Sequence, residues 1–448
     1  MDAFTILTLV VVFTAVAAWA NDRFLHLPSA IGVMIAGLLI AGGTIWAHTL
    51  GWVDDARAVE LVNALHFDTL LVAGYGSGAA GQGILLGLLL FAAALQLEPA
   101  SMTRRIGFII WLATIGVVLT AVGTALGFQF LLELGGHPTT FLNLLIFGAI
   151  LAPTDPVAAL SLLRRTSAPV RVREVITGES LFNDGVSIIL FLLLLAISSG
   201  SAESPWEGRW GLGFLVETGG ALVVGFVIGL IGKALVSTAR QVSVIVLVTM
   251  AIVLSIGVVS PLFHVSCPVT CVVAGLVIGR SPALRQREGE QASSFWGIIE
   301  QSLTAILFLM IGLELLAVNL SWSAVFWSMA VIPILLAARF VSLAIPWAAA
   351  RMIGRTTVSL EEIVLMTWCG LRGGVSIAMC IALPGTIIVS EDGDSLRSHA
   401  LVATIVVVIG SILIQGLTVE RLARFVQRRT DRRAARLAEQ AKPDEAAA

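Results

Sequence analysis

Long apolar runs separated by short polar stretches cover almost the whole chain. An apolar run of about 17–25 residues or more can, as a helix, cross the roughly 30 Å hydrocarbon core of a bilayer. We therefore predict an all-α polytopic membrane protein with about thirteen transmembrane helices. The predicted spans cover residues 4–20, 28–48, 80–98, 106–132, 140–163, 174–199, 211–235, 242–260, 262–279, 294–318, 322–350, 359–384 and 398–420.

Composition agrees with this pattern and narrows the possible functions. Of the 448 residues, 57% are hydrophobic and only 12% are charged, whereas a soluble domain has about 25% charged residues. No basic stripe interleaved with aromatic residues occurs, so we expect no nucleic-acid partner. Four cysteines lie in apolar runs without metal-ligand spacing, and we expect small buried side chains there and no cofactor. They are Cys267, Cys271, Cys369 and Cys380.

Arginine and lysine indicate which side of the membrane is cytoplasmic. With thirteen spans, the loops on the side of the C-terminus hold 14 of the 27 Lys and Arg residues, and the segment after residue 420 holds eight more. The loops on the opposite side hold three. The positive-inside rule then puts the C-terminus in the cytoplasm and the N-terminus outside, in a multi-pass protein of the cell (inner) membrane. Residues 426–448 are expected to form a short cytoplasmic tail.

Five charged residues lie deep inside predicted spans. A charge at the centre of a membrane helix costs roughly 2.5–3.5 kcal/mol, so such a residue is functional or paired by default. Asp184 lies ten residues into its span, or about 15 Å at 1.5 Å per residue, which is half of the hydrocarbon core. We therefore place Asp184 near the midplane. The five are Asp155, Glu179, Asp184, Arg339 and Arg372.

Helix geometry separates the two carboxylates of the sixth span. Ser180 and Asp184 are four residues apart and share a face, as do Glu179 and Asn183. Glu179 and Asp184 are five residues apart, which turns them about 140° from each other. They are poorly placed to share a proton, so we expect two different roles. A structural role in a buried ion pair is favoured for Glu179, and a functional role is favoured for Asp184.

Two predicted spans are interrupted in the middle. In the fifth, Pro153 and Pro156 bracket Thr154 and Asp155, and prolines remove backbone donors and restrict the residues before them. In the twelfth, three glycines surround Arg372. We expect both helices to unwind at these points. The alternative is a simple proline kink and a glycine-packed helix interface.

The two interrupted spans occupy corresponding positions in the chain. The fifth would run from outside to inside and the twelfth from inside to outside, seven spans later. This is the relation expected if spans 1–6 and 8–13 are two inverted six-helix repeats, and interrupted spans in such positions indicate a transporter's midplane site. Asp155 could compensate the positive half-helix ends there, and Arg372 the negative ones.

Several motifs give the chain a family resemblance. They are "LAPTDP", "GESLFNDG", "HVSCPVTCVVAGLVIGR", "ILFLMIGLELL" and "TWCGLRGGVSIAMCIALP". In this order, from about residue 85 to 385, they resemble the NhaP-type branch of the sodium/proton exchangers, in the cation:proton antiporter superfamily. The Asn–Asp pair at 183–184 is similar to the electroneutral members. The resemblance implies a homodimeric secondary transporter rather than an enzyme.

The resemblance also implies a division of the membrane domain, residues 1–425. A six-helix core would move against a dimerisation scaffold during transport. The core would consist of residues 104–199 and 322–425, and the scaffold of residues 1–98 and 211–318.

By the same resemblance, Asp184 would bind the transported cation and the proton in turn. Ser180, Thr154 and Asp155 would complete this cation and proton site. Carboxylate and hydroxyl oxygens are ligands that hard cations prefer. One carboxylate can hold a proton or a cation but not both, so carrying one on each crossing gives 1:1 exchange without net charge movement.

Supporting roles and departures follow from the same comparison. Glu179, paired with Arg372, and Asn183 would be structural. Ala92 stands where many members have a Glu, so one possible site carboxylate is missing. Thr304 stands where Asn is common, and Cys267 where Gly is usual. These departures bear on which cation the site prefers and not on the class of mechanism.

Sequence alone leaves some alternatives open. The cation could be Na⁺, Li⁺ or K⁺, so a K⁺/H⁺ antiporter of the same fold is the nearest alternative. A cation channel would also place acids in the membrane. An intramembrane aspartyl protease would need two facing Asp, for which Asp155 and Asp184 could be considered, but the chain has no GxGD motif.

Overall fold

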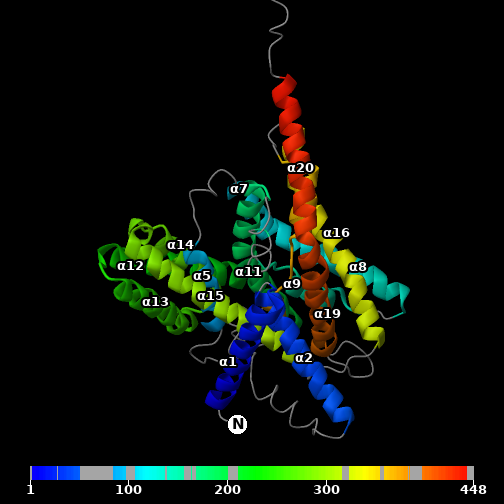
Figure 1. The fold of residues 1–448 in the computed structure, drawn as a ribbon, viewed down its shortest axis with the longest axis horizontal. Helices are drawn as coiled ribbons and strands as arrows, with labels where there is room; N and C mark the ends of the chain where they lie inside the picture. The colour runs from blue at the N-terminus through cyan, green and yellow to red at the C-terminus, as the bar shows by residue number, and fades with distance from the viewer. Residues whose placement is uncertain are drawn as a thin grey trace, which may run out of the picture.

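A computed structural model describes residues 3–27, 29–50, 84–96, 106–136, 139–155, 163, 168–199, 210–314, 322–353, 358–381, 383 and 396–440. These residues form helices and short connections, and no β-strand occurs among them (Figure 1). The α-helices are α1 (Ala3–Ala20), α2 (Ser29–Thr49), α5 (Ile84–Leu95), α7 (Ile106–Trp111), α8 (Val117–Leu134), α9 (Phe141–Leu151), α11 (Val170–Ser199), α12 (Trp210–Thr238), α13 (Val242–Leu262), α14 (Cys267–Gly279), α15 (Arg287–Glu314), α16 (Trp322–Met352), α17 (Leu360–Trp368), α18 (Gly374–Ile381), α19 (Leu396–Gly410) and α20 (Gly416–Gln440). Shorter π-helical and 3₁₀ segments are η1 (Asn21–Leu25), η3 (Leu112–Gly116), η4 (Pro282–Arg285) and η6 (Ser411–Gln415).

The helices agree with an all-α membrane protein. Within the described residues, eight helical segments are long and apolar enough to cross a membrane, and three shorter helices are also apolar. The three shorter helices are Ile31–Thr44 within α2, α9 and α14. Each predicted span contains helical residues. The prediction of an all-α polytopic membrane protein is therefore confirmed at this level, whereas the number thirteen stays a prediction.

Both predicted interruptions lie where the helices end. α9 stops at Leu151, and residues 152–155 leave the helix. α17 stops at Trp368 and α18 starts at Gly374, so residues 369–373 form a non-helical link between them. Pro153 has no backbone N–H to continue the helical ladder, whereas the second break is rich in glycine, the most costly residue in a helix after proline. Pro156, the other predicted helix breaker, lies outside the described residues.

One group of helices packs through small residues. α5, α12, α13, α14 and α15 contact one another and lie together on the left of Figure 1. A Cβ atom added to Gly275 would lie 2.9 Å from the backbone oxygen of Phe91, so α14 approaches α5 closely. On the other face of α14, a Cβ atom at Gly225 of α12 would lie 2.7 Å from the backbone oxygen of Thr270. Small residues allow such close packing of membrane helices.

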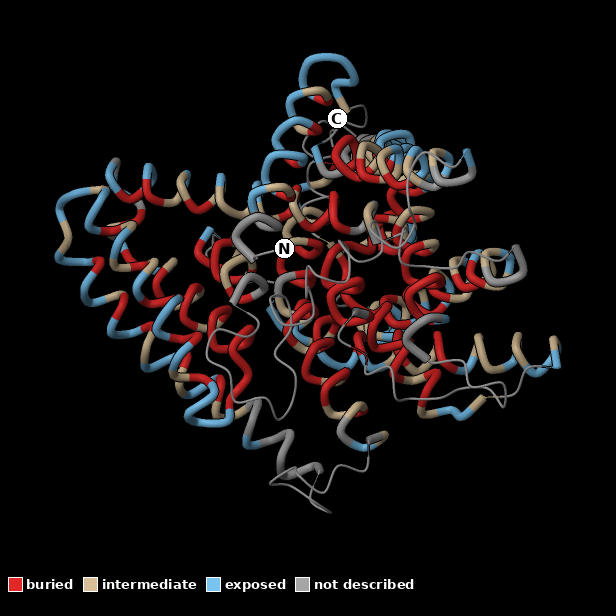
Figure 2. The backbone as a smooth tube through the Cα atoms, turned by 90° about the horizontal axis from the view of Figure 1, so that it is seen from below, coloured by how far each residue is buried: buried red, intermediate tan, exposed pale blue. Residues whose placement is uncertain are grey.

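A second group surrounds the two breaks. α8 and α9 pack together, α16 contacts α8 and α19, and α11 contacts α9, η3 and, on the other side, α12 and α14. The centre of the molecule is buried, and the exposed residues gather at its outer helices (Figure 2). Large apolar side chains are exposed there, such as Val223, which is 64% exposed, and Leu247, which is 69% exposed. Such faces suit contact with lipid.

Candidate ion-binding site

The two breaks are joined to each other by a backbone hydrogen bond. The N–H of Asp155 donates to the carbonyl oxygen of Leu371, at 2.8 Å. This close approach depends on Gly373, because a Cβ atom at that position would lie 2.7 Å from the Cβ atom of Asp155. The two non-helical links are therefore held side by side within the second helix group.

Arg372 lies at the carbonyl end of α9. Its guanidinium group donates through Nη1 to the carbonyl oxygens of Ala152 and Pro153, the latter at 2.8 Å. The last carbonyls of a helix carry partial negative charge and have no intrahelical partner. The positive charge of Arg372 therefore stabilises the end of α9, as the sequence suggested. The backbone N–H of Arg372 in turn donates to Oγ of Ser411, at 3.1 Å.

Glu179 pairs with Arg339, and the predicted pair with Arg372 is wrong. Nη1 of Arg339 donates to Oε1 of Glu179 at 2.8 Å, and Nη2 donates to Oε2 at 2.9 Å. Both residues are buried, each with 3% of its surface exposed. This is a bidentate ion pair between α16 and α11, the geometry in which guanidinium and carboxylate groups bind most strongly.

The physical reason for this difference is the surroundings of each arginine. The guanidinium group of Arg372 is held by carbonyl oxygens at the α9 break. The side chain of Arg339 passes directly over Gly370, where an added Cβ atom would lie 2.6 Å from its Cδ atom. The glycine in the second break thus gives Arg339 the space to reach Glu179.

Three polar side chains link α11 to the first break. Nδ2 of Asn183 donates to Oγ1 of Thr154 at 2.8 Å, and Oγ1 of Thr154 shares a hydrogen bond with Oγ of Ser180 at 3.0 Å. All three residues are buried. These bonds fix the Thr154 hydroxyl beside the turn of α11 that carries Asp184.

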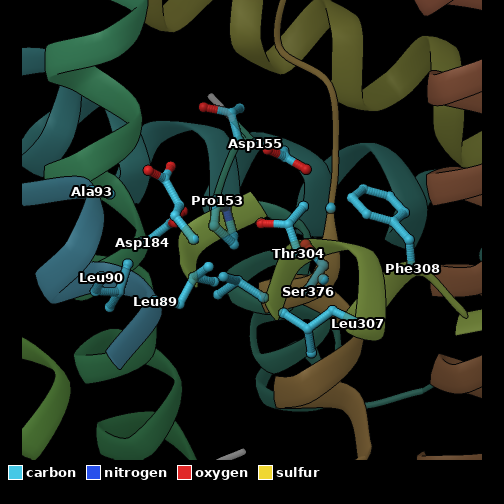
Figure 3. Close-up of a pocket in the computed structure, with 15 residues that line it drawn as sticks. Leu89, Leu90, Ala93, Pro153, Asp155, Asp184, Thr304, Leu307, Phe308 and Ser376 are labelled. Carbon is cyan, nitrogen blue, oxygen red and sulfur yellow. The ribbon is translucent and has the colours of Figure 1, made fainter. Parts of the chain in front are cut away.

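Asp184 lines a pocket between the two helix groups. The pocket measures about 560 Å³, its open mouth included. Asp155 and Thr154 line it from the first break, and Figure 3 shows Asp155 and Asp184 on the same side of it. Asp184 is only 5% exposed, and its Oδ1 has no hydrogen-bond partner among the described residues. Desolvating a carboxylate without a partner is costly, so this atom indicates a place for a ligand.

The remaining pocket walls come from α5, α15 and the start of α18. Among the described residues, α5 contributes the apolar side chains of Leu89, Leu90 and Ala93. α15 contributes Glu300 and Thr304. Glu300 is a pocket carboxylate that the sequence analysis did not single out. It lies six residues into the predicted span 294–318.

The three departures from the family pattern have different surroundings. Thr304 lines the pocket. Ala92 is fully buried in α5, and its carbonyl oxygen accepts a hydrogen bond from Nε2 of Gln96. Cys267 is a buried free thiol in α14, on the side that faces Gly87 of α5. Only the first of these positions touches the pocket directly.

The fold and the site together define a class of protein. Two interrupted helices that meet beside a buried carboxylate, in a pocket between two groups of membrane helices, are typical of secondary transporters. Comparison with known proteins leads to the family. Residues 9–425 match the sequence family described as "Sodium/hydrogen exchanger, transmembrane". The chain belongs to this family.

Individual relatives cover nearly the whole chain. The Na⁺/H⁺ antiporter NhaP of Pseudomonas aeruginosa is 32% identical over 424 residues, 93% of this chain and 95% of its own. The Na⁺/H⁺ antiporter NhaH of Halobacillus dabanensis is 26% identical and covers 91% of this chain and 94% of its own. Among solved structures, the sodium proton antiporter MjNhaP1 of Methanocaldococcus jannaschii aligns with a TM-score of 0.71 at 19% identity, covering 94% of this chain and 97% of its own. That structure supports the fold.

Proposed function

We propose that this protein is a secondary active transporter that exchanges a monovalent cation for H⁺ across the membrane. The observation that carries the proposal is the buried carboxylate of Asp184, whose Oδ1 has no partner among the described residues and which lines a pocket beside the two breaks. The relatives that align over nearly their whole length are named as Na⁺/H⁺ antiporters. Na⁺ is the expected substrate, and Li⁺ and K⁺ are tested beside it.

The ligands of the cation would be oxygen atoms. Asp184 supplies a carboxylate, and Thr154 and Ser180 supply hydroxyl oxygens that already share a hydrogen bond at 3.0 Å. Asp155 lines the same pocket and contributes a second carboxylate. Oxygen ligands of this kind suit hard cations. A proton on Asp184 removes the charge that attracts the cation, so the two ions compete for one position.

Electroneutral 1:1 exchange follows if Asp184 is the only carrier of charge. Glu179 and Arg339 neutralise each other in a buried pair, so neither needs to bind or release an ion during transport. Arg372 is tied to the carbonyl end of α9. The transported site would then cross the membrane with either one cation or one proton, and no net charge would move per cycle.

Alternating access would involve the two helix groups. The core, residues 104–199 and 322–425, would move against the scaffold, residues 1–98 and 211–318. The pocket lining supports this division, because α5 and α15 belong to the scaffold whereas α11, α18 and the first break belong to the core. The backbone bond between the breaks supports two inverted repeats whose interrupted helices cross at the site.

Location and assembly complete the proposal. The distribution of Lys and Arg supports a location in the cell (inner) membrane, with the N-terminus outside and the C-terminus in the cytoplasm. The exposed apolar faces of α12 and α13 belong to the scaffold, and we propose that the scaffold forms the interface of a homodimer.

Exchange by the purified protein in proteoliposomes tests the function. We expect addition of Na⁺ on one side to drive protons to the other, and Li⁺ and K⁺ to be compared under the same conditions. Imposing a membrane potential should leave the initial rate unchanged, because no net charge moves. A rate that changes several-fold with the potential would exclude the scheme with one carboxylate. Absence of cation-dependent proton flux would exclude the antiporter function itself.

A further inference from the structure

Glu300 and Thr304 present oxygen atoms to the pocket from one face of α15. They are four residues apart, so they lie one above the other on the helix, and both line the pocket that contains Asp184. Glu300 is half-buried, and its partner Gln96 is exposed, whereas Asp184 is 5% exposed. The pocket therefore runs from a more accessible carboxylate to a buried one.

Gln96 holds the Glu300 carboxylate in place. Nε2 of Gln96 donates to Oε2 of Glu300 at 2.6 Å and also to the carbonyl oxygen of Ala92 at 2.9 Å. The space for this amide comes from Gly297, where an added Cβ atom would lie 2.9 Å from Oε1 of Gln96. Gln96 is neutral, so its hydrogen bond orients the carboxylate without cancelling its charge.

A further hydroxyl group lines the pocket beside those of Thr154 and Thr304. Ser376 of α18 is fully buried, and its Oγ has no hydrogen-bond partner among the residues that the structure describes. Ser376 and Thr304 both line this pocket (Figure 3). Together with Oδ1 of Asp184, the pocket thus contains two buried oxygen atoms that lack a partner within the described part of the chain, and such atoms indicate a ligand or water.

We infer that Glu300 is an outer binding residue for the transported monovalent cation, which it passes along the Thr304 and Ser376 hydroxyls to Asp184. This inference rests on the proposed exchange function. It also accounts for a departure in the sequence. Ala92 leaves α5 without the carboxylate that many members carry, whereas Glu300 brings one to the pocket from α15, and Gln96 is hydrogen-bonded to both residues.

Glu300→Gln tests this role because it keeps the shape and the hydrogen-bonding capacity but removes the charge. A carboxylate at the mouth of a pocket raises the local concentration of cations. The apparent KM for Na⁺ should therefore rise roughly three- to tenfold in proteoliposomes, with kcat changed by less than about twofold. Glu300→Asp should recover part of the affinity, and Gln96→Ala should give a smaller rise in KM because the carboxylate loses its orientation.

Glu290→Gln is the matched control. It removes the same charge from the same helix, but Glu290 is exposed in the first turn of α15, ten residues from Glu300. Its KM for Na⁺ should equal that of the wild type. An unchanged KM in Glu300→Gln would overturn the inference, and so would an equal rise in both variants, which would reflect a loss of general surface charge.

A binding measurement separates this inference from the proposed function. Na⁺ should raise the melting temperature of the purified wild type, and Glu300→Gln should need several-fold more Na⁺ for the same increase. This readout does not require turnover. If the wild type showed no exchange, the proposed function would fail, and the Na⁺ dependence of the melting temperature would still decide the role of Glu300. Equal Na⁺ dependence in wild type and variant would refute that role.

Discussion

Arg339 of α16 binds Glu179 of α11 through Nη1 and Nη2 of its guanidinium group, at 2.8 and 2.9 Å. The two side chains come from helices that are distant in the sequence, and both are almost completely buried. A buried pair of this kind contributes little more than well-packed apolar side chains would, but removing one partner leaves a buried charge alone. The pair therefore constrains what each residue can be replaced by.

The first prediction concerns this ion pair. Glu179→Gln should lower stability by roughly 3–5 kcal/mol, because the charge of Arg339 loses its partner. The melting temperature of the purified protein in detergent measures this effect. Glu179→Gln combined with Arg339→Gln should recover part of the loss. If Arg372→Gln restored stability and Arg339→Gln did not, the pairing described here would be incorrect.

The second prediction concerns the carrier of charge. Asp184→Asn should fold normally, since a carboxylate without a partner at Oδ1 among the described residues is replaced by a neutral group of the same size. It should neither exchange Na⁺ for H⁺ nor release protons when Na⁺ is added. The measurement is Na⁺-dependent proton flux in proteoliposomes, with the melting temperature as a check of folding. Substantial coupled exchange in this variant would assign the carrier role to another residue, with Asp155 as the next candidate.

The third prediction concerns the hydroxyl ligands. Ser180→Ala removes one oxygen and its hydrogen bond to Thr154, whereas Asn183 still holds Thr154. The apparent KM for Na⁺ should rise several-fold while turnover persists, since one hydrogen bond is worth about 1 kcal/mol. Initial rates of exchange in proteoliposomes, measured over a range of Na⁺ concentrations, give both quantities.

Ser255→Ala of α13 is the control for this substitution. Its hydroxyl is exposed and donates to the carbonyl oxygen of Ala251 in the same helix, so its loss should leave the KM for Na⁺ unchanged. A complete loss of exchange in Ser180→Ala, or an unchanged KM, would contradict a ligand role for the Ser180 hydroxyl.

The fourth prediction concerns competition between protons and Na⁺. Both would occupy the Asp184 carboxylate, so a lower pH should raise the apparent KM for Na⁺, by up to about tenfold per pH unit. The rate at saturating Na⁺ should change much less, because enough Na⁺ displaces the proton. Initial rates across a matrix of pH and Na⁺ concentration measure both quantities. A KM that is independent of pH would mean that the two ions bind at separate sites.

The fifth prediction concerns the contact between the two breaks. Gly373→Ala would place a Cβ atom 2.7 Å from that of Asp155, closer than two non-bonded carbon atoms can approach. The breaks should separate, and the exchange rate should fall by more than about tenfold. Gly219→Ala is the control, because nothing lies within 4 Å of a Cβ atom added there in α12. Full activity of Gly373→Ala would show that the contact is not needed.

Local signals in the sequence predicted much of the fold and of the site. The breaks at Thr154 and Arg372 follow from proline and glycine, which act on the backbone at their own positions. The shared face of Ser180 and Asp184 follows from the helical period alone. These features needed no knowledge of how the helices pack against each other.

Features that depend on packing were harder to predict. Two buried arginines were available to Glu179, and the sequence carries no distance between helices that would select Arg339. Glu300 lies six residues into the predicted span 294–318, where a charge would be close to water. However, α15 begins at Arg287, seven residues before the predicted span. Its first turns are polar but still helical. Glu300 is therefore well inside the helix, and hydropathy does not show this.

The contribution of α5 to the pocket wall has a mechanical consequence. Leu89, Leu90 and Ala93 have hydrocarbon side chains, which cannot form hydrogen bonds with Asp184 or with the first break across the pocket. Their contacts are dispersion contacts, which have no preferred direction and can be replaced by similar contacts after a small displacement. Sliding of the opposite wall past α5 would therefore break no directional bond with these three residues. These three residues would therefore let the candidate ion site shift along α5 in the proposed alternating-access cycle.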